Sequence, residues 1–140
     1  MDNSKNKIKV EVFVRKPLEE VWEYFTNPDH IVHWNFASDD WHCPYAENQL
    51  KDGGKFKYTM ASKDGKFSFD FAGEFLEVWY LKKLILKLGD DRLVRITFDQ
   101  SHKGVLIKEV FEAENVYSPE QQKAGWQTIL NNFKIYAESR

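Results

Sequence analysis

The sequence predicts an α+β fold in which a curved, seven-stranded antiparallel sheet wraps around a long C-terminal helix, with two short helices after the first strand. Three observations predict it. Residues 118–140 combine a helix cap with apolar residues at helical spacing. Short alternating segments joined by turn signals fill residues 55–115, and strands joined by such turns pair in sequence order. A further alternating segment at residues 7–15 is followed by a helical pattern.

The N-terminal part of the chain contains the first strand and the two short helices. Apolar and charged residues alternate over Lys7–Arg15, which is typical of a strand with one buried face. Pro17 fits the first turn of a helix and opens an amphipathic segment that runs to Thr26. Asn27 is a suitable N-cap for a second helix from Pro28 to about His33.

The middle of the chain predicts six strands. Asp64-Gly65 is a strong hairpin signal, and Gly73 indicates a bulge or bend before a segment that brings Trp79 to the apolar face. Residues 34–50 have no clear period, so a loop and a short strand are expected there. The other expected strands are 55–61, 67–79, 84–88, 94–99 and 105–115.

The C-terminal segment predicts a helix that covers the sheet. Ser118 is a hydroxyl N-cap, Pro119 fits the first helical position, and Gln121 completes a capping box. A helix of about twenty residues is roughly 30 Å long, so it needs an apolar surface of similar length. Gly125 costs about 1 kcal/mol relative to alanine inside a helix, so we expect close packing against a strand at that position. The apolar face would contain Trp126, Ile129, Leu130, Phe133, Tyr136 and Ala137.

Composition excludes several classes of function. The net charge is −2 and basic residues are spread along the chain, so no attraction to nucleic acid or anionic membranes is expected. There is no run of 18 apolar residues, and the N-terminus is polar, so neither a membrane span nor a signal peptide is predicted. We expect one domain, residues 1–140, in the cytoplasm, as a monomer or homodimer.

The sequence offers no recognisable catalytic or metal motif. Cys43 is the only cysteine, which excludes a disulfide framework, and the four histidines form no triad motif. His30 and His33 share a helix face beside Asp29, but a solvated surface is the favoured interpretation. We therefore expect no catalytic residue, no metal and no cofactor.

Five segments carry a family resemblance, in this order along the chain: Pro17–Trp22, Asn27–Asp29 with Trp34, Gly53–Phe56, Gly73–Val78 and Gly125–Leu130. Together they resemble the activator of Hsp90 ATPase homologue 1-like family, within the START-like superfamily, which is also called SRPBCC or Bet v 1-like helix-grip. The resemblance implies the helix-grip fold and a pocket for a hydrophobic or amphipathic small molecule between sheet and helix. It also implies an alternative partner, a chaperone whose ATPase the outer surface would stimulate. Lys16 and Glu109 depart from the family pattern.

The aromatic content of 16% predicts either a very aromatic core or a lined cavity, and the sequence leaves both open. The predicted function is a binding protein for a hydrophobic or amphipathic small molecule. A co-chaperone-like module is the alternative, and an enzyme of unknown reaction is the third hypothesis. The expected ligand-binding residues are Trp34, Trp41, Tyr58, Met60, Phe69, Phe71, Trp79, Phe98, Glu109, Trp126, Leu130 and Phe133.

One charge falls on an apolar face of the last strand. Glu109 lies between Ile107 and Phe111, while the opposite register would bury Lys108 instead. We favour an inward Glu109 because its neighbours are bulkier. An unpaired buried carboxylate is too costly to remain ionised, so we predict that Glu109 is the polar anchor of the pocket. Its expected partner is a water, Tyr58, or a hydroxyl or amine of the ligand.

Overall fold

The computed structural model describes residues 6–140, so residues 1–5 of the expected 1–140 domain lie outside the described part. The described chain has the expected α+β architecture of seven strands and three helices. The elements are β1 (Lys7–Val14), α1 (Leu18–Thr26), α2 (Pro28–Ile31), β2 (Trp41–Asn48), β3 (Lys55–Ser62), β4 (Ser68–Trp79), β5 (Lys83–Leu88), β6 (Leu93–Ser101), β7 (Gly104–Glu112) and α3 (Pro119–Glu138).

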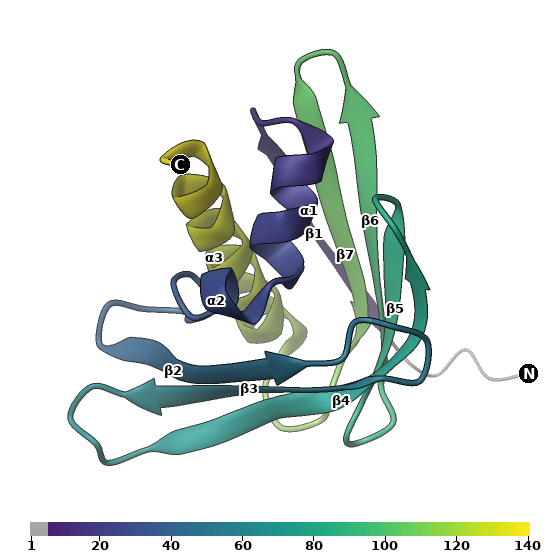
Figure 1. Ribbon diagram of the computed structural model, residues 1–140. Helices are drawn as coiled ribbons and strands as arrows, with labels where there is room; N and C mark the ends of the chain where they lie inside the picture. The colour runs from purple at the N-terminus through teal and green to yellow at the C-terminus, as the bar shows by residue number, and fades with distance from the viewer. Residues whose placement is uncertain (1–5) are drawn as a thin grey trace, which may run out of the picture.

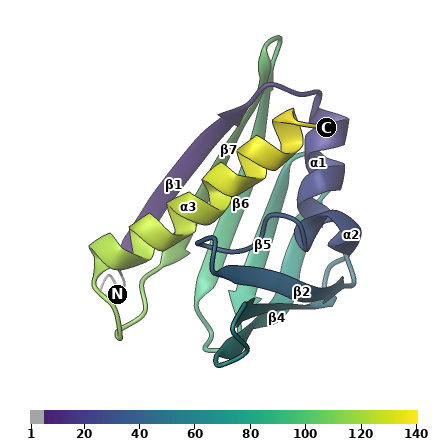
Figure 2. The same cartoon turned by 90° about the vertical axis from the view of Figure 1, so that its left-hand side faces the viewer.

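The strands form one antiparallel sheet in the order β1-β7-β6-β5-β4-β3-β2. Only β1 leaves sequence order, because it pairs with the last strand, β7. The sheet is strongly curved, and β2, β3 and β4 run across the direction of β6 and β7 (Figure 1). Helix α3 lies along the concave face beside β1 and β7 (Figure 2). The predicted helix-grip arrangement is confirmed.

Both ends of α3 are fixed by hydrogen bonds. The predicted capping box is present: Ser118 Oγ accepts from the Gln121 backbone, and Gln121 Oε1 accepts from the Ser118 backbone. Near the other end, the Glu138 carboxylate accepts a hydrogen bond of 2.9 Å from the Arg15 backbone N–H. Lys134 donates to the Phe13 carbonyl. These contacts hold α3 against the start of the chain, over the β1 side of the sheet.

The core lies under α1 and α3 at the end of the sheet formed by β1, β7 and β6. From α1, Trp22 and Phe25 point into it, with ring centroids 5.1 and 5.3 Å from that of Phe98 on β6. Phe133 of α3 meets Phe25 at 5.1 Å. Because both helices cover this end, the concave face of β3, β4 and β5 is left without a packed helix.

The bulge in β4 lies near Leu76, and its predicted place at Gly73 is wrong. The register with β5 shifts between Phe75 and Glu77, whereas Gly73 remains paired with Leu88. Gly73 has another reason to be glycine: a Cβ atom there would lie 2.2 Å from the carbonyl oxygen of Lys87. The extra residue of the bulge reverses which side chains face inward beyond it.

Trp79 faces away from the concave side as a consequence of this bulge. Val78 pairs with Leu84, whose side chain is buried, while the Trp79 side chain is 53% exposed. Its indole N–H donates to the Glu77 carboxylate at 2.7 Å, and the Lys83 ammonium lies over its ring. The prediction that Trp79 points between sheet and helix is therefore wrong.

Two other boundaries differ from the sequence prediction. Helix α2 ends at Ile31 rather than near His33, and the chain continues as a turn. Strand β2 is longer than expected, but its register with β3 shifts between His42 and Tyr45. Pro44 lies in this shift, and its missing N–H interrupts the ladder. Within residues 6–140, none of the helices is long and apolar enough to cross a bilayer.

Candidate functional site

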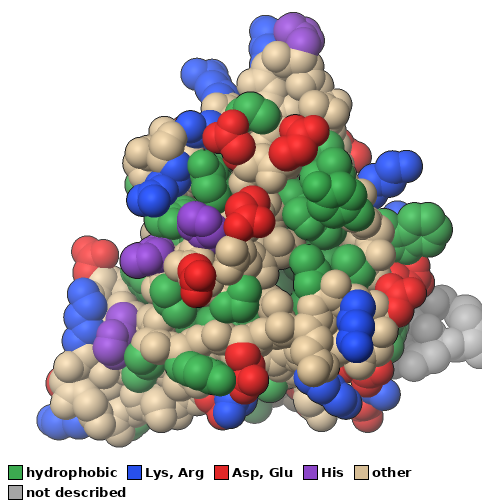
Figure 3. Space-filling view, in the orientation of Figure 1, with side chains coloured by type: hydrophobic (Ala, Val, Ile, Leu, Met, Phe, Trp, Pro, Cys, Tyr) green, Lys and Arg blue, Asp and Glu red, His purple; other side chains and the backbone are tan. Residues whose placement is uncertain are grey.

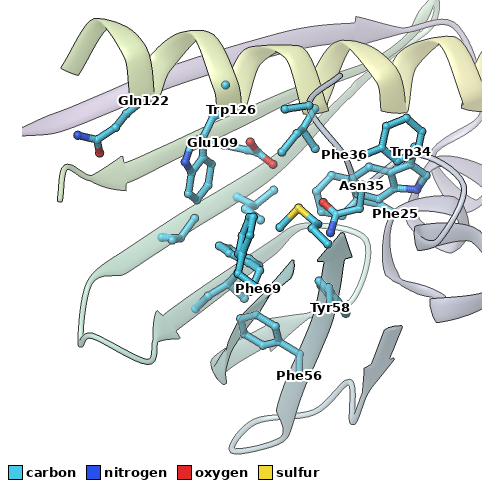
Figure 4. Close-up of a pocket in the computed structure, with 18 of the residues that line it drawn as sticks. Phe25, Trp34, Asn35, Phe36, Phe56, Tyr58, Phe69, Glu109, Gln122 and Trp126 are labelled. Carbon is cyan, nitrogen blue, oxygen red and sulfur yellow. The ribbon is translucent and has the colours of Figure 1, made fainter. Parts of the chain in front are cut away.

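A cavity of about 480 Å³ lies between α3 and the uncovered half of the sheet. Figure 4 shows its walls, and Figure 3 shows a hollow near the centre of one face, bordered by hydrophobic side chains. The inner face of β3, β4 and β5 forms the floor, and the loop 35–38 closes one side. The apolar lining consists of Phe25, Trp34, Phe36, Ala37, Trp41, Leu50, Phe56, Tyr58, Met60, Phe69, Phe71, Phe75, Leu84, Leu86, Val94, Ile96, Trp126 and Ile129.

Eight of the twelve predicted site residues line this cavity. They come from the loop after α2, four strands and α3, so the fold brings together residues up to 92 positions apart, from Trp34 to Trp126. That any of them contacts a ligand stays a prediction. The eight are Trp34, Trp41, Tyr58, Met60, Phe69, Phe71, Glu109 and Trp126.

The other four predicted residues do not line the cavity. Trp79 lies on the outer surface, as described above. Phe98, Leu130 and Phe133 face the concave side as expected, but they are buried in the core. The reason is α1, which packs over this end of the sheet and fills the space that the sequence pattern left open.

A row of aromatic rings forms the wall nearest β7. Trp126 stacks on Phe111 with a centroid distance of 3.8 Å and an interplanar angle of 13°. Trp126 also makes a T-shaped contact with Phe71, with a centroid distance of 5.8 Å. Phe71 in turn lies 5.7 Å from Phe56. Faces and edges of aromatic rings make favourable contacts with other rings, and ring faces also attract cations.

Glu109 is the one acidic side chain that projects from the middle of the sheet into this apolar space. It is 8% exposed, lies between the fully buried Ile107 and Phe111, and pairs across the sheet with Val10 and Ile96. The predicted inward register is therefore confirmed. Within residues 6–140, its carboxyl group has no hydrogen bond or ion pair, and Tyr58 is not its partner. Burial raises the pKa of Glu109 to about 8.

Two further polar groups face the cavity on the opposite wall. Asn48 Nδ2 donates to the Tyr58 hydroxyl at 3.0 Å and to the Thr26 carbonyl at 2.9 Å. Burial raises the pKa of Tyr58 to about 12, so its hydroxyl is neutral at physiological pH. Asn35 is buried, and its Nδ2 has no partner in hydrogen-bond geometry within the described chain, although the Cys43 sulfur lies close enough to interact.

Asn35 and its neighbours Phe36, Ala37 and Ser38 are site residues that the sequence did not indicate. They lie in a loop without periodicity, so no alternation marks which side chains point inward. The amide nitrogen of Asn35 is itself buried and lies within interaction range of the Cys43 sulfur, so it is not exposed to the cavity as a free donor. The one signal in the sequence was the high density of apolar side chains in this loop.

The polar groups at the other end of the cavity already have partners. Arg92 is paired with Asp90 at 2.8 Å and donates to the Glu112 carbonyl at 3.2 Å. The Gln122 amide donates to the carbonyls of Glu114 and Tyr117 and accepts from the Glu114 backbone. This end is therefore a closed network of hydrogen bonds.

Outside the cavity, Cys43, His30 and His33 are potentially reactive side chains whose surroundings the structure describes. Burial raises the pKa of the Cys43 thiol, whereas a nucleophilic cysteine needs a lowered value. His30 Nδ1 lies 2.6 Å from the Tyr136 hydroxyl, and His33 stacks on the Tyr136 ring. No group of three or more potential metal ligands converges within residues 6–140.

Gly125 lines the cavity, and its predicted close packing against a strand is wrong. A Cβ atom at this position would meet no other atom within 4 Å. We expect Gly125→Ala to raise the free energy of unfolding by about 1 kcal/mol, because alanine loses less backbone entropy in a helix. Denaturant titration checks this, and a loss of stability would show that the space beside Gly125 is occupied.

Comparisons with known proteins agree on one family. The family model described as "Activator of Hsp90 ATPase homolog 1-like protein" matches residues 15–138. The chain is similar to a solution structure of an AHSA1-like protein from Aeromonas hydrophila, with 41% identity, 96% of this chain and 93% of that chain covered, and a TM-score of 0.91. It is also similar to a protein from Cytophaga hutchinsonii, with 46% identity, coverage of 95% and 92%, and a TM-score of 0.82.

Structures with lower sequence identity share only the fold with this chain. A crystal structure of a protein from Nitrosomonas europaea shares 20% identity and has a TM-score of 0.79, with 99% of this chain and 97% of that chain covered. A comparison with curated proteins gives no significant match.

Proposed function

The chain belongs to the activator of Hsp90 ATPase homologue 1-like family, and we propose that it is a cytoplasmic binding protein for a hydrophobic or amphipathic small molecule. The observation behind the proposal is the apolar cavity of about 480 Å³ between sheet and α3. Protein interiors pack as densely as organic crystals, so a space of this size is not an ordinary packing defect. It falls within the range of about 300–1,000 Å³ that is usual for small-molecule sites.

The lining also suits the chemistry of such a ligand. Apolar contact supplies affinity at about 25 cal/mol per Å² of buried apolar surface, and the aromatic walls offer much of it. Few polar groups orient a ligand in sites of this kind. Among the described residues, Glu109 offers such a group, because its carboxyl group lines the cavity without a hydrogen bond or ion pair.

A cavity-filling variant tests the proposal. Gly125→Leu places a branched apolar side chain where a Cβ atom meets open space, so the variant should fold while occupying part of the site. We expect a thermal-shift and native mass spectrometry screen of lipids and aromatic metabolites to find ligands of the natural protein. Gly125→Leu should weaken their binding about tenfold or more, which is about 1.4 kcal/mol.

Gly125→Ala is the matched control, because it adds one methyl group and should leave binding unchanged. Ligands that bind equally to the natural protein and to Gly125→Leu would lie outside the cavity. That result, or a screen without any ligand, would contradict the proposal.

Stimulation of a heat-shock ATPase is the second candidate function, and the description of the family supports it. Such an activity would use the outer surface, where Phe67, Tyr80 and Val116 are exposed apolar side chains. An ATPase assay with the chaperone of the same organism tests it. The Gly125→Leu variant should retain full stimulation, since its change lies inside the cavity. If the natural protein does not stimulate the ATPase, this candidate function is wrong.

A further inference from the structure

Glu109 is a buried acid without a partner among the described residues. Its carboxyl group lines the cavity and, within residues 6–140, has neither a hydrogen bond nor an ion pair. Figure 4 shows it projecting from β7 beside Trp126 into the space between helix and sheet. Buried carboxyl groups are normally hydrogen-bonded or paired, because an unsatisfied one is costly. The missing partner is therefore not among residues 6–140, and a bound molecule in the cavity can supply it.

Aromatic rings line the part of the cavity beside Glu109. Phe111, two residues along the strand from Glu109, stacks on Trp126, and Trp126 meets Phe71 at 5.8 Å. Both Trp126 and Phe71 line the cavity together with Glu109. A carboxylate beside aromatic rings is a favourable environment for an ammonium group, because both the negative charge and the π faces attract a cation.

No cation from residues 6–140 occupies this place. Lys108 points to the opposite face of the sheet, and Arg92 is held by Asp90 and by the Glu112 carbonyl. Apart from Glu109, the ionisable side chains of the lining are Tyr58, Arg92, Glu114 and Tyr117. The elements that pack against Glu109 itself present apolar residues, Val10 from β1 and Ile96 from β6. When Glu109 ionises, its carboxylate therefore meets no competing cation from residues 6–140.

On the basis of the proposed binding function, we infer that the ligand is an amphipathic amine, whose apolar part fills the cavity and whose ammonium group pairs with Glu109 against Trp126 and Phe71. A bound anion would keep Glu109 protonated and gain no attraction from the ring faces, and a hydrocarbon would leave the acid unsatisfied. A neutral alcohol would satisfy one hydrogen bond and likewise place no cation against the rings. Among these ligand classes, the amine interacts favourably with both the carboxylate of Glu109 and the faces of the aromatic rings.

Binding of such a cation is coupled to proton release. At neutral pH, Glu109 in the empty cavity is protonated for most of the time, since burial raises its pKa to about 8. When an ammonium ion enters, the carboxyl group gives its proton to the solvent and becomes the carboxylate of the ion pair. Only the ionised fraction is competent for this pairing, so the apparent affinity rises roughly tenfold or more between pH 6 and pH 8.

Three ligands with the same ten-carbon chain test the inference: decylamine, decan-1-ol and decanoic acid. Their dissociation constants are measured below micelle-forming concentrations, for example by calorimetry or displacement of a fluorescent probe, at pH 6, 7 and 8. We expect decylamine to bind at least about tenfold more tightly than the alcohol at pH 8, and decanoic acid to bind most weakly. The affinity for the alcohol should be independent of pH.

Glu109→Gln is the matched variant, because it keeps the shape of the side chain and removes its charge. It should lose the preference for decylamine and the pH dependence while binding decan-1-ol as the natural protein does. Glu109→Met, a second variant without the charge, should also lose the preference for decylamine and the pH dependence, which excludes a specific effect of the amide. Circular dichroism confirms that both variants are folded.

The outcomes separate the ligand class from the binding function. If decan-1-ol binds as tightly as decylamine, or if Glu109→Gln leaves decylamine binding unchanged, the ligand is not an amine that pairs with Glu109. The cavity would still be a binding site. If none of the three ligands binds and the wider screen also finds none, the binding function itself fails.

Discussion

Replacing Phe133 with alanine is expected to lower the free energy of unfolding by about 3–5 kcal/mol, the range for large aromatic deletions in a core. The Phe133 side chain is 0% exposed. Its ring centroid lies 5.1 Å from that of Phe25 and 4.9 Å from that of Trp34, both in edge-to-face arrangements. The deletion would therefore open a hole where α1, α3 and the loop after α2 meet.

Denaturant titration measures this effect, and Ile135→Ala is a suitable control on the same helix. Ile135 is 68% exposed, so its truncation should change the free energy of unfolding by less than about 0.5 kcal/mol. A loss below about 1 kcal/mol for Phe133→Ala would mean that the surrounding rings close the hole, or that α3 does not cover the core in this register.

The fold was predictable where local patterns and turn chemistry agree. The alternation in β1 specifies a strand and its buried face, and the capping box specifies where α3 begins. Both are present. Strand order followed from short turns alone, because hairpin-connected strands pair with their neighbours in sequence. The pairing of β1 with β7 closes the sheet around the helix.

Irregular strands limited the prediction. A bulge changes which side chains face inward, and the sequence around Leu76 gives no sign that the extra residue lies there rather than at Gly73. Trp79 was therefore assigned to the wrong face. In β2, the register shift around Pro44 hid the alternation, so most of that strand was expected to be a loop.

The site residues on the strands were predictable from the sequence, whereas those in the loop 35–38 and the boundary between cavity and core were not. The parity of β3 places Tyr58 and Met60 in the cavity, and the bulky neighbours of Glu109 place its side chain inward. The boundary between core and cavity depends on where α1 packs, which is a tertiary property. For the same reason, Phe98 and Phe133 could not be distinguished from cavity residues by their spacing.

Glu109 is expected to make the stability of the protein decrease as pH rises through the neutral range. Its pKa is about 8 in the folded protein, against 4.5 for an ordinary glutamate. Between these values the folded state holds a proton that the unfolded state has lost, so the free energy of unfolding falls with increasing pH. At 1.36 kcal/mol per pKa unit, the loss reaches about 3 kcal/mol at pH 7.

Glu109→Gln removes this titration and measures the effect directly. Below pH 4.5 both side chains are neutral, so the variant and the natural protein should have similar stability. By pH 7 the variant should be more stable by about 3 kcal/mol in urea titrations, because its folding does not require the uptake of a proton. Parallel stability curves for the two proteins from pH 4.5 to pH 8 would show that Glu109 ionises freely in the cavity.

Glu138 provides a control of opposite sign. Hydrogen bonds from the Arg15 backbone and Lys134 lower the pKa of its carboxyl group. Its contribution to stability is therefore present at neutral pH and is lost as pH falls through its folded-state pKa. Glu138→Gln should thus destabilise the protein at pH 7 and matter less on acidification, whereas Glu109→Gln stabilises it at pH 7. Opposite effects of two glutamates at the same pH would show that burial without a partner, rather than net charge, sets the response of Glu109.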